Sequence, residues 1–310
     1  MRTLKSPLTN KDNVVCERSI KTSDIIELYK KEYNIDLNST FNGITYISLY
    51  KCLDTNYRFY YPFHLQGDDR FYSALSKENW YYRPWKWEHE QCKKFIKDDF
   101  KLLEVGAGSG SFINKISQYF KNIECVGLEF NTSAIEIARN SGINLLNESI
   151  EIHSNNKQEY YDLVCSFQVL EHISEVYPFI EAQLKCLKKG GKLLISVPNN
   201  DSFLKENTLN SKILNMPPHH MGLWNEKSLT SLTSIFNIKL EKILFEPLQV
   251  EHYDTYQYTI IKKIFLNIDW IAQIYWRLHW KLGLHKIFRI HIKNNSHKII
   301  GHTIIAVYQK

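Results

Sequence analysis

The stretch Phe100-Lys-Leu-Leu-Glu-Val-Gly-Ala-Gly-Ser-Gly110 decides the fold. It begins with a short, largely apolar run typical of a buried strand, and three glycines follow at alternate positions. Glycine lets the chain turn tightly and approach a ligand closely, because it has no Cβ. A helix is expected next, from Ser111 to about Tyr119. The stretch therefore predicts a strand, a ligand-binding loop and a helix in direct succession.

Expected strands and helices continue to alternate along the chain. Strands are expected at 123–128, 143–147, 161–167 and 193–197, with helices at about 131–140 and 176–187 between them. A helix near 226–235 precedes two more strands, at 238–245 and 299–308. Alternating strands and helices predict a parallel sheet with helices on its faces. We expect an α/β fold with a doubly wound, seven-stranded, mostly parallel sheet, whose last two strands run antiparallel to the rest or to each other.

Residues 85–310 are expected to form the main domain, which contains the predicted sheet. Two regions lie outside this sheet. The first, residues 1–84, is an N-terminal extension that is dense in aromatic side chains from Tyr57 onward. We expect most of these aromatics to pack as a core between the two parts rather than to form a lid over a site. The second region, about 249–297, interrupts the last two strands. Its apolar residues recur at helical spacing, which predicts a helical insertion.

The insertion is basic. Between 262 and 293 the chain has seven Lys or Arg residues and one acid, Asp269, so this stretch accounts for the whole formal charge of +6. Trp270, Trp276 and Trp280 lie among the basic residues. Two interpretations stay open: an ordinary surface helix with extended lysines, or a segment that rests on an anionic membrane surface or holds an anionic acceptor.

The remaining composition indicates a reducing compartment. Six cysteines are spread along the 310 residues without any CxxC pair, which favours free thiols. The N-terminus lacks the apolar stretch of a signal peptide, and no apolar run reaches the roughly 18 residues of a membrane span. We therefore expect a cytoplasmic protein.

The expected ligand of the glycine loop is a nucleoside that carries a positive charge. Glu129 ends the second strand, where a carboxylate in such folds accepts hydrogen bonds from both ribose hydroxyls. The dinucleotide fingerprint would need a third glycine at the position of Ser111. Glu104, just before the loop, would attract a cation and repel a pyrophosphate. These residues argue against a dinucleotide-binding dehydrogenase.

Four stretches in this order, 103–110, 126–129, 161–173 and 187–193, together resemble class I S-adenosylmethionine-dependent methyltransferases. Residues 161–173 (Tyr-Asp-Leu-Val-Cys-Ser-Phe-Gln-Val-Leu-Glu-His-Ile) are similar to the fourth-strand motif of one branch. That branch contains the ubiquinone-pathway O-methyltransferases and many sugar and natural-product methyltransferases. The resemblance implies a Rossmann-like fold, an enzyme, and S-adenosylmethionine as its cofactor.

The resemblance also implies a role for each matching residue. The glycine loop would hold the methionine part of the cofactor, Phe130 and the residues after the third strand would border the adenine, and the end of the fourth strand would lie under the sulfonium. The expected cofactor-binding residues are Glu104, Gly106, Ala107, Gly108, Gly110, Glu129, Phe130, Ser149, Ile150, Phe167 and Gln168.

The N-terminal extension looks like that of bacterial methyltransferases with a small cysteine-rich module, in which two CxxC pairs bind zinc. In this chain the comparable positions read Cys16-x-x-Ser19 and Cys52-x-x-Thr55. Structural zinc normally takes four Cys or His ligands, and only two remain. We expect a metal-free remnant of a zinc ribbon and no metal site.

Three histidines are the candidates for catalysis. His219 and His220 follow two prolines in the loop after the fifth strand, where ligands bind in such sheets. They would act as a base or a substrate clamp, or else only bond to the backbone, and the sequence does not distinguish between the two histidines. His172, after the fourth strand, is the third candidate. A base is needed only if the acceptor is a hydroxyl or a protonated amine.

The sequence thus predicts S-adenosylmethionine-dependent methyl transfer to a small-molecule or glycan acceptor, at oxygen. The alternatives are N-methylation of an amino sugar or another amine, and a non-catalytic binding or scaffold protein with the same fold. Nucleic acid is a disfavoured partner, because base methyltransferases carry an Asn/Asp-Pro-Pro-aromatic motif where this chain has Phe167-Gln-Val-Leu170. The acceptor, the methylated atom and the oligomeric state stay open.

Overall fold

The computed structural model describes residues 3–310 except 76, 79–82, 144, 204–212 and 267. Trp80, Tyr81 and Tyr82 of the aromatic region therefore lie outside the described residues. A large seven-stranded sheet forms the centre, in the order β10-β11-β8-β7-β4-β5-β6. Its strands are β4 (Lys101–Val105), β5 (Glu124–Leu128), β6 (Leu145–Leu146), β7 (Tyr161–Phe167), β8 (Leu187–Pro198), β10 (Lys239–Pro247) and β11 (Ile300–Gln309).

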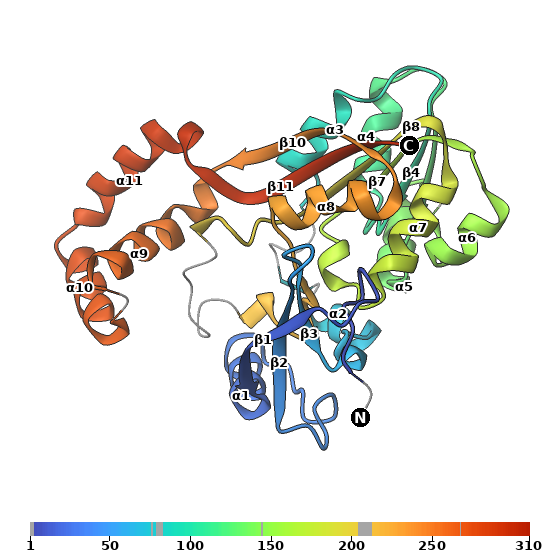
Figure 1. The fold of residues 1–310 in the computed structure, drawn as a ribbon. Helices are drawn as coiled ribbons and strands as arrows, with labels where there is room; N and C mark the ends of the chain where they lie inside the picture. The colour runs from blue at the N-terminus through green and yellow to red at the C-terminus, as the bar shows by residue number, and fades with distance from the viewer. Residues whose placement is uncertain (1–2, 76, 79–82, 144, 204–212, 267) are drawn as a thin grey trace.

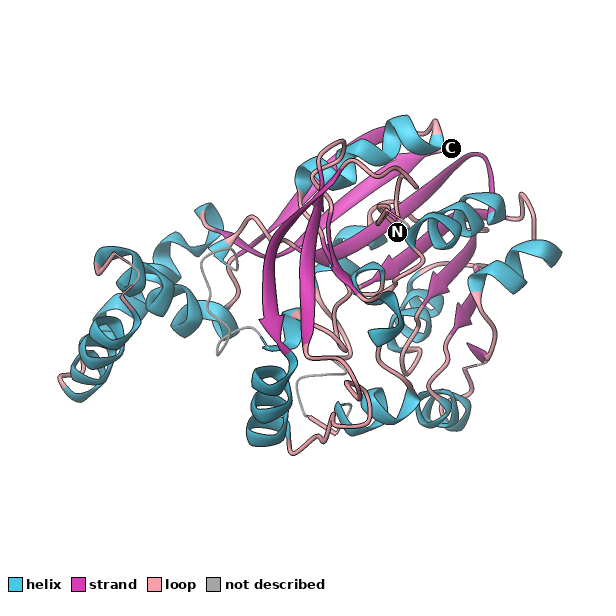
Figure 2. Ribbon diagram, turned by 60° about the horizontal axis from the view of Figure 1, so that its bottom comes forward, coloured by secondary structure: helices cyan, strands magenta, loops and turns pink. Residues whose placement is uncertain are grey.

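The strand directions confirm the predicted fold class. Strands β4 to β8 pair in parallel, while β11 is antiparallel to both of its neighbours, β8 and β10. The predicted alternation of helices is also present (Figures 1 and 2). The helices of this part are α3 (Trp87–Lys93), α4 (Ser111–Tyr119), α5 (Thr132–Asn140), α6 (Ile150–Asn156), α7 (Val176–Cys186) and α8 (Glu226–Phe236).

The two faces of the sheet bury alternate residues of the same strands. On β4, Leu103 packs with residues of α7 and α8, whereas its neighbour Leu102 packs with residues of α3 and α4. On β7, Val164 packs on the same face as Leu103, and Leu163 packs on the same face as Leu102. Successive side chains of a strand point to opposite faces, so both faces of the sheet are covered. The continuous apolar runs in the sequence reflect this double burial.

The N-terminal extension forms a smaller antiparallel sheet, in the order β1-β2-β3-β9. Its last strand, β9, comes from residues 222–223, far from the other three strands in the sequence. Tyr57, Phe59 and Trp224 are buried between the two parts, with the rings of Tyr57 and Trp224 4.3 Å apart, so these aromatics form core rather than a lid. The elements are β1 (Val14–Lys21), α1 (Thr22–Tyr33), β2 (Tyr46–Cys52), β3 (Arg58–Tyr61), α2 (Asp69–Leu75) and β9 (Gly222–Leu223).

The two cysteines of the expected zinc-ribbon remnant lie on neighbouring strands of this small sheet. Cys16 on β1 is exposed, and Cys52 on β2 is buried. All six cysteines of the chain are free thiols in the structure.

The basic insertion forms three helices, which we call the helical arm: α9 (Tyr253–Ile264), α10 (Asp269–Lys281) and α11 (Leu284–Asn295). Figure 1 shows the arm projecting from the end of the β10–β11 pair, away from the large sheet. Gly283, with a φ of 72°, makes the turn between α10 and α11. A short 3₁₀ turn, η6 (Val250–His252), joins the arm to β10. None of the described helices has the length and apolar character needed to cross a membrane.

Candidate active site

A cavity of about 1130 Å³ lies at the carboxyl ends of β4, β5, β7 and β8. Every predicted site residue except Gly110 lines it. Gly110 instead begins α4 with a φ of 73°, and a Cβ there would lie 3.0 Å from Cγ2 of Ile143. Its part in the site is therefore to turn and pack the loop. The cavity matches the general position of ligands in doubly wound sheets.

The glycine loop is fixed by backbone hydrogen bonds to the neighbouring strand. The N–H groups of Gly106 and Ala107 both donate to the carbonyl oxygen of Leu128, each at 2.9 Å. Gly106 has a φ of 75°, and a Cβ at this position would lie only 2.4 Å from Cγ2 of Val169. Position 106 therefore requires glycine for both its backbone conformation and its surroundings.

Glu129 is held in place by the loop it faces. Its Oε2 accepts a hydrogen bond from the Gly108 N–H at 2.7 Å, and its Oε1 accepts from Phe130 N and Asn131 N, each at 2.9 Å. Burial raises the pKa of the Glu129 carboxyl, while these backbone bonds act in the opposite direction. A carboxylate offers about four acceptor positions, so one is left for ribose hydroxyls.

Glu104 is a deeply buried acid of the cavity wall. The residue is 3% exposed, and its Oε2 has no hydrogen-bond partner among the described residues. Burial raises the pKa of the Glu104 carboxyl well above its ordinary range, the nearby Glu129 raises it further, and Lys86 lowers it. A buried acceptor without a donor is costly unless a ligand supplies one.

These two acids provide the test of fit for the cofactor. S-adenosylmethionine carries ribose hydroxyls, one of which can donate to the remaining acceptor position of Glu129, and a cationic amino group, which matches the open acceptor of Glu104. Phe130, which is 57% exposed, Ser149 and Ile150 line the adjoining wall. The residues present therefore fit a nucleoside with a positively charged end.

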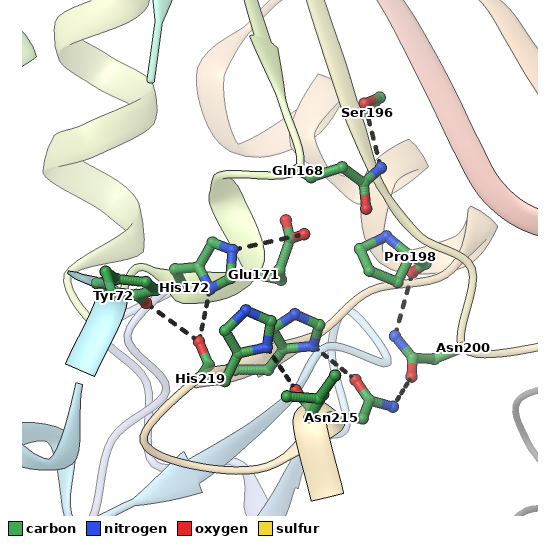
Figure 3. Close-up of polar contacts among 11 residues, drawn as sticks. Tyr72, Gln168, Glu171, His172, Ser196, Pro198, Asn200, Asn215 and His219 are labelled. Atoms are coloured by element: carbon green, nitrogen blue, oxygen red, sulfur yellow. Dashed lines mark hydrogen bonds and ion pairs between the residues drawn. The ribbon is translucent and has the colours of Figure 1, made fainter. Parts of the chain in front are cut away.

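The three candidate histidines lie together at the wall of the cavity. Figure 3 shows two of them, His172 and His219. His172 lies in the turn after β7, whereas His219 and His220 lie in the loop that leads into β9. The rings of His219 and His220 stack with centroids 4.4 Å apart, and the His172 ring packs against both, at 4.7 Å and 4.9 Å. Sequence analysis gave these residues as candidates from two separate segments, and the fold places their rings in contact.

Each of the three rings uses Nδ1 for a hydrogen bond to an oxygen. His172 Nδ1 donates to the carbonyl of His219 at 2.5 Å, and His219 Nδ1 donates to that of Leu214 at 2.8 Å. His220 Nδ1 lies 2.8 Å from Oδ1 of Asn215. The Asn215 amide donates to Oδ1 of Asn200, which identifies its own oxygen as the acceptor for His220. These bonds select the Nδ1–H tautomers, in which Nε2 carries the lone pair.

Burial keeps the three histidines neutral. It lowers the pKa of His172 to about 4, and with the help of the neighbouring imidazoles it lowers the pKa of His219 and of His220 well below the ordinary value. Glu171 is next to this cluster, with Oε1 3.9 Å from His172 Nε2 and Oε2 without a hydrogen-bond partner among the described side chains. Burial raises the pKa of Glu171 to about 8.

The N-terminal extension holds the histidine loop. The Tyr72 hydroxyl donates to the carbonyl of His219 at 3.4 Å, and the Tyr60 hydroxyl donates to that of Asn215 at 3.3 Å. The Gly67 N–H donates to the carbonyl of Pro218 at 2.8 Å. The histidine side of the cavity is therefore positioned by segments that lie far apart in the sequence.

Sequence reasoning missed several charged groups of the cavity wall. Glu171 stands beside a candidate histidine in the motif, but its burial could not be read from its position. His89, Glu246 and the ion pair of Arg83 with Glu251 come from segments with no motif. Burial lowers the pKa of His89 to about 3 and raises that of Glu246 to about 7.

The histidine cluster also has the spacing of a metal site. One possible ligand atom from each of His172, His219 and His220 lies within 4.8 Å of the others. Within the described ranges of the chain, this is the one group of three histidines, cysteines or carboxylates with such spacing. Three imidazole nitrogens are a ligand set that zinc accepts.

A family model and several curated proteins match parts of this chain. The family model described as "Methyltransferase domain" matches residues 78–242. The ubiquinone biosynthesis O-methyltransferase of Erwinia tasmaniensis is 28% identical over 108 residues, which are 33% of this chain and 44% of that protein. An uncharacterized protein of Methanocaldococcus jannaschii is 33% identical over 132 residues, which are 40% of this chain and 53% of that protein. The chain thus spans about half the length of these curated relatives.

A solved structure has the same fold. The crystal structure of a SAM-dependent methyltransferase from Archaeoglobus fulgidus superimposes with a TM-score of 0.50 at 14% identity, and the superposition covers 77% of this chain and all of that one. The family model covers more than half of the chain, including the glycine loop, Glu129 and the histidine cluster. The chain belongs to the class I S-adenosylmethionine-dependent methyltransferases.

Proposed function

We propose that this protein transfers a methyl group from S-adenosylmethionine to a hydroxyl group of a small-molecule or glycan acceptor. The observation that carries the proposal is the cluster of His172, His219 and His220 in the same cavity as the glycine loop. Bound there, S-adenosylmethionine supplies an electrophilic methyl group on its sulfonium. The chain contributes the alignment of the acceptor and the removal of its proton.

The cofactor side of the cavity is proposed to be formed by the predicted residues. Glu129 would bind the ribose, Glu104 would face the cationic end, and Phe167 and Gln168, at the end of β7, would line the methyl position. Gln168 has a φ of 56°, which is rare for a residue other than glycine, and its N–H donates to the carbonyl of Ser196 at 2.9 Å. Such strained conformations are concentrated at functional sites.

The tautomers of the histidines favour oxygen as the methylated atom. A hydroxyl is a weak nucleophile until it loses its proton, so its methylation needs a neutral base within hydrogen-bond reach. Each imidazole of the cluster is held with its lone pair on Nε2, and burial keeps it unprotonated at neutral pH. An amine acceptor in its neutral form would not need such a base.

The test is a transfer assay with radiolabelled S-adenosylmethionine against matched pairs of phenols, sugars and nucleotide sugars that carry either a hydroxyl or an amino group. We expect labelled product from a hydroxyl acceptor, with the methyl group located on oxygen by NMR. Labelling of the amino member alone would overturn the oxygen assignment. Calorimetry with S-adenosylhomocysteine accompanies the assay, because failure to bind would instead support a scaffold protein.

The role of the cluster is tested by changing each histidine to alanine, with exposed His297 as the matched control. We expect at least one of the three variants to lose about 100-fold in transfer rate, since general bases contribute at least that factor. Its affinity for S-adenosylhomocysteine should stay unchanged, as should every property of the His297→Ala control. Full turnover in all three variants would show that the histidine loop is only structural.

A further inference from the structure

Exposed large hydrophobic side chains are concentrated on the helical arm and its loops. More than half of the large hydrophobic side chains that are exposed in the described chain lie between 264 and 290. Leu266 is 84% exposed, Leu282 69% and Ile287 67%. Exposed apolar side chains that gather on one part of a protein mark a site of contact with a partner or a membrane.

Helix α10 has two distinct faces. A helix turns by about 100° per residue, so Trp270, Ile274, Arg277, Leu278 and Lys281 fall within an arc of about 100°. All five are exposed. On the opposite side, Ala272 and His279 are buried inside the arm. The exposed face therefore combines large apolar side chains with cations.

The arm does not need this exposed face for its own folding. Its interior is closed by ring contacts between α9 and α10, such as that of Tyr258 with Trp276 at 5.4 Å, and by the bond between Gln257 and His279 at 2.7 Å. A separate apolar cluster, which includes Leu248 and Ile292, ties the arm to the body.

The positive charge of the arm favours an anionic partner. The exposed cations of α10 and α11 are Arg277, Lys281, Lys286, Arg289 and Lys293, and Asp269 is the only acid in the sequence of these two helices. Arg289 also pairs with Asp254 of α9, at 3.6 Å. A second copy of the arm would place like charges against each other, whereas an anionic surface complements them.

We infer that the helical arm is a peripheral membrane anchor, which lies on a bilayer containing anionic phospholipids. The apolar side chains would enter the boundary between headgroups and acyl chains, and the lysines and arginines would contact lipid phosphates. The arm begins directly after η6, whose Glu251 and His252 line the cavity. Binding would therefore hold the mouth of the active site near the bilayer. This inference does not depend on the acceptor proposed above.

The experiment is co-sedimentation of the whole protein with vesicles of phosphatidylcholine alone or mixed with phosphatidylglycerol. We expect binding to the mixed vesicles, a shift of tryptophan fluorescence to shorter wavelength, and weaker binding as salt is added. Equal binding to both vesicle types would overturn the electrostatic part of the inference, and absence of binding would overturn the whole.

Two variants locate the contact. The triple variant Trp270→Ser, Ile274→Ser, Leu278→Ser should bind at least about tenfold more weakly, since each buried apolar group adds to the partition free energy. Its matched control changes three exposed apolar residues of the body, Leu53→Ser, Ile137→Ser and Ile152→Ser, and should bind as the unchanged protein does.

The second variant, Arg277→Gln with Lys281→Gln, should lose about fivefold for each cation removed. Its control, Lys97→Gln with Lys121→Gln, should lose nothing. Unchanged circular dichroism and binding of S-adenosylhomocysteine would show that each variant is folded. If the triple variant instead abolishes a dimer seen by sedimentation while vesicles remain unbound, the arm is a self-association surface and the inference is wrong.

Discussion

The backbone N–H of Gly108 donates to Oε2 of Glu129 over 2.7 Å, so the glycine loop and the proposed ribose carboxylate are joined within the protein itself. Two further backbone N–H groups hold Oε1 of the same side chain. The carboxylate is therefore fixed in orientation without help from a ligand. A fixed binding group loses little entropy when its ligand arrives, which increases affinity.

The first prediction concerns this carboxylate. Glu129→Ala should weaken the binding of S-adenosylhomocysteine by about 10- to 100-fold, because a charge-assisted hydrogen bond to the ribose is lost. Isothermal titration calorimetry measures the effect. Glu136→Ala, an exposed acid of α5, is the control and should bind normally. Equal affinity of both variants would remove Glu129 from the cofactor site.

The second prediction concerns the backbone of the loop. Gly106→Ala should abolish measurable binding of S-adenosylhomocysteine, because its Cβ would lie 2.4 Å from Val169 and its φ of 75° is strained for alanine. Gly43→Ala also has a positive φ but meets no atom within 4 Å, so it controls for backbone strain alone. A Gly106→Ala protein that still binds the nucleoside would contradict the geometry of the loop.

The third prediction is loss of stability in acid. In the folded protein the pKa of His172 is lowered to about 4, and those of His219 and His220 are lowered as well. At these three positions the unfolded chain therefore binds more protons than the folded one below about pH 6.5. The contribution of each histidine to the free energy of unfolding should fall by about 1.4 kcal/mol per pH unit as pH decreases from 6.5 toward 4. Urea denaturation across this range measures the slope, and His220→Gln should make it shallower.

The fourth prediction has the opposite sign. The folded-state pKa of Glu171 is raised from 4.5 to about 8, so the folded protein binds the extra proton between these values and Glu171 lowers stability as pH rises. Compared with the unchanged protein, Glu171→Gln should lose less free energy of unfolding between pH 5 and pH 8. If both proteins lose the same free energy of unfolding between pH 5 and pH 8, Glu171 is not buried as the structure shows.

The fifth prediction separates bases from metal ligands. If the three histidines act as bases, dialysis against EDTA should leave the methyl transfer rate unchanged. A rate that falls on dialysis and returns with zinc would instead assign His172, His219 and His220 to a metal ion, for which their spacing is suitable.

Sequence patterns were most informative where local chemistry decides the structure. The apolar runs at 100–105 and 161–167 predict strands that the structure has as β4 and β7. The helix expected at about 131–140 is present as α5, which Asn131 caps by accepting a hydrogen bond from Ala134 N. Helix α6 was not expected, because its seven residues carry little apolar periodicity. Ser149, expected near adenine, also caps this helix by accepting a hydrogen bond from Ile152 N.

The rest of the site depends on contacts between distant segments. No spacing rule brings Tyr72 to the carbonyl of His219, 147 residues away, or places β9 beside β3. The burial of Glu171 is likewise a property of the assembled cavity. Sequence reasoning could therefore name the histidines one by one, but not the cluster that they form.

The shared sheet of β1, β2, β3 and β9 has a consequence for engineering. The proposed cofactor residues all lie in one stretch of about 100–170, while the loop with His219 and His220 is braced by the extension. Grafting an extension from a relative, together with its matching histidine loop, should exchange acceptor preference without disturbing nucleoside binding. Grafting the stretch 100–170 alone should leave the acceptor preference with the host.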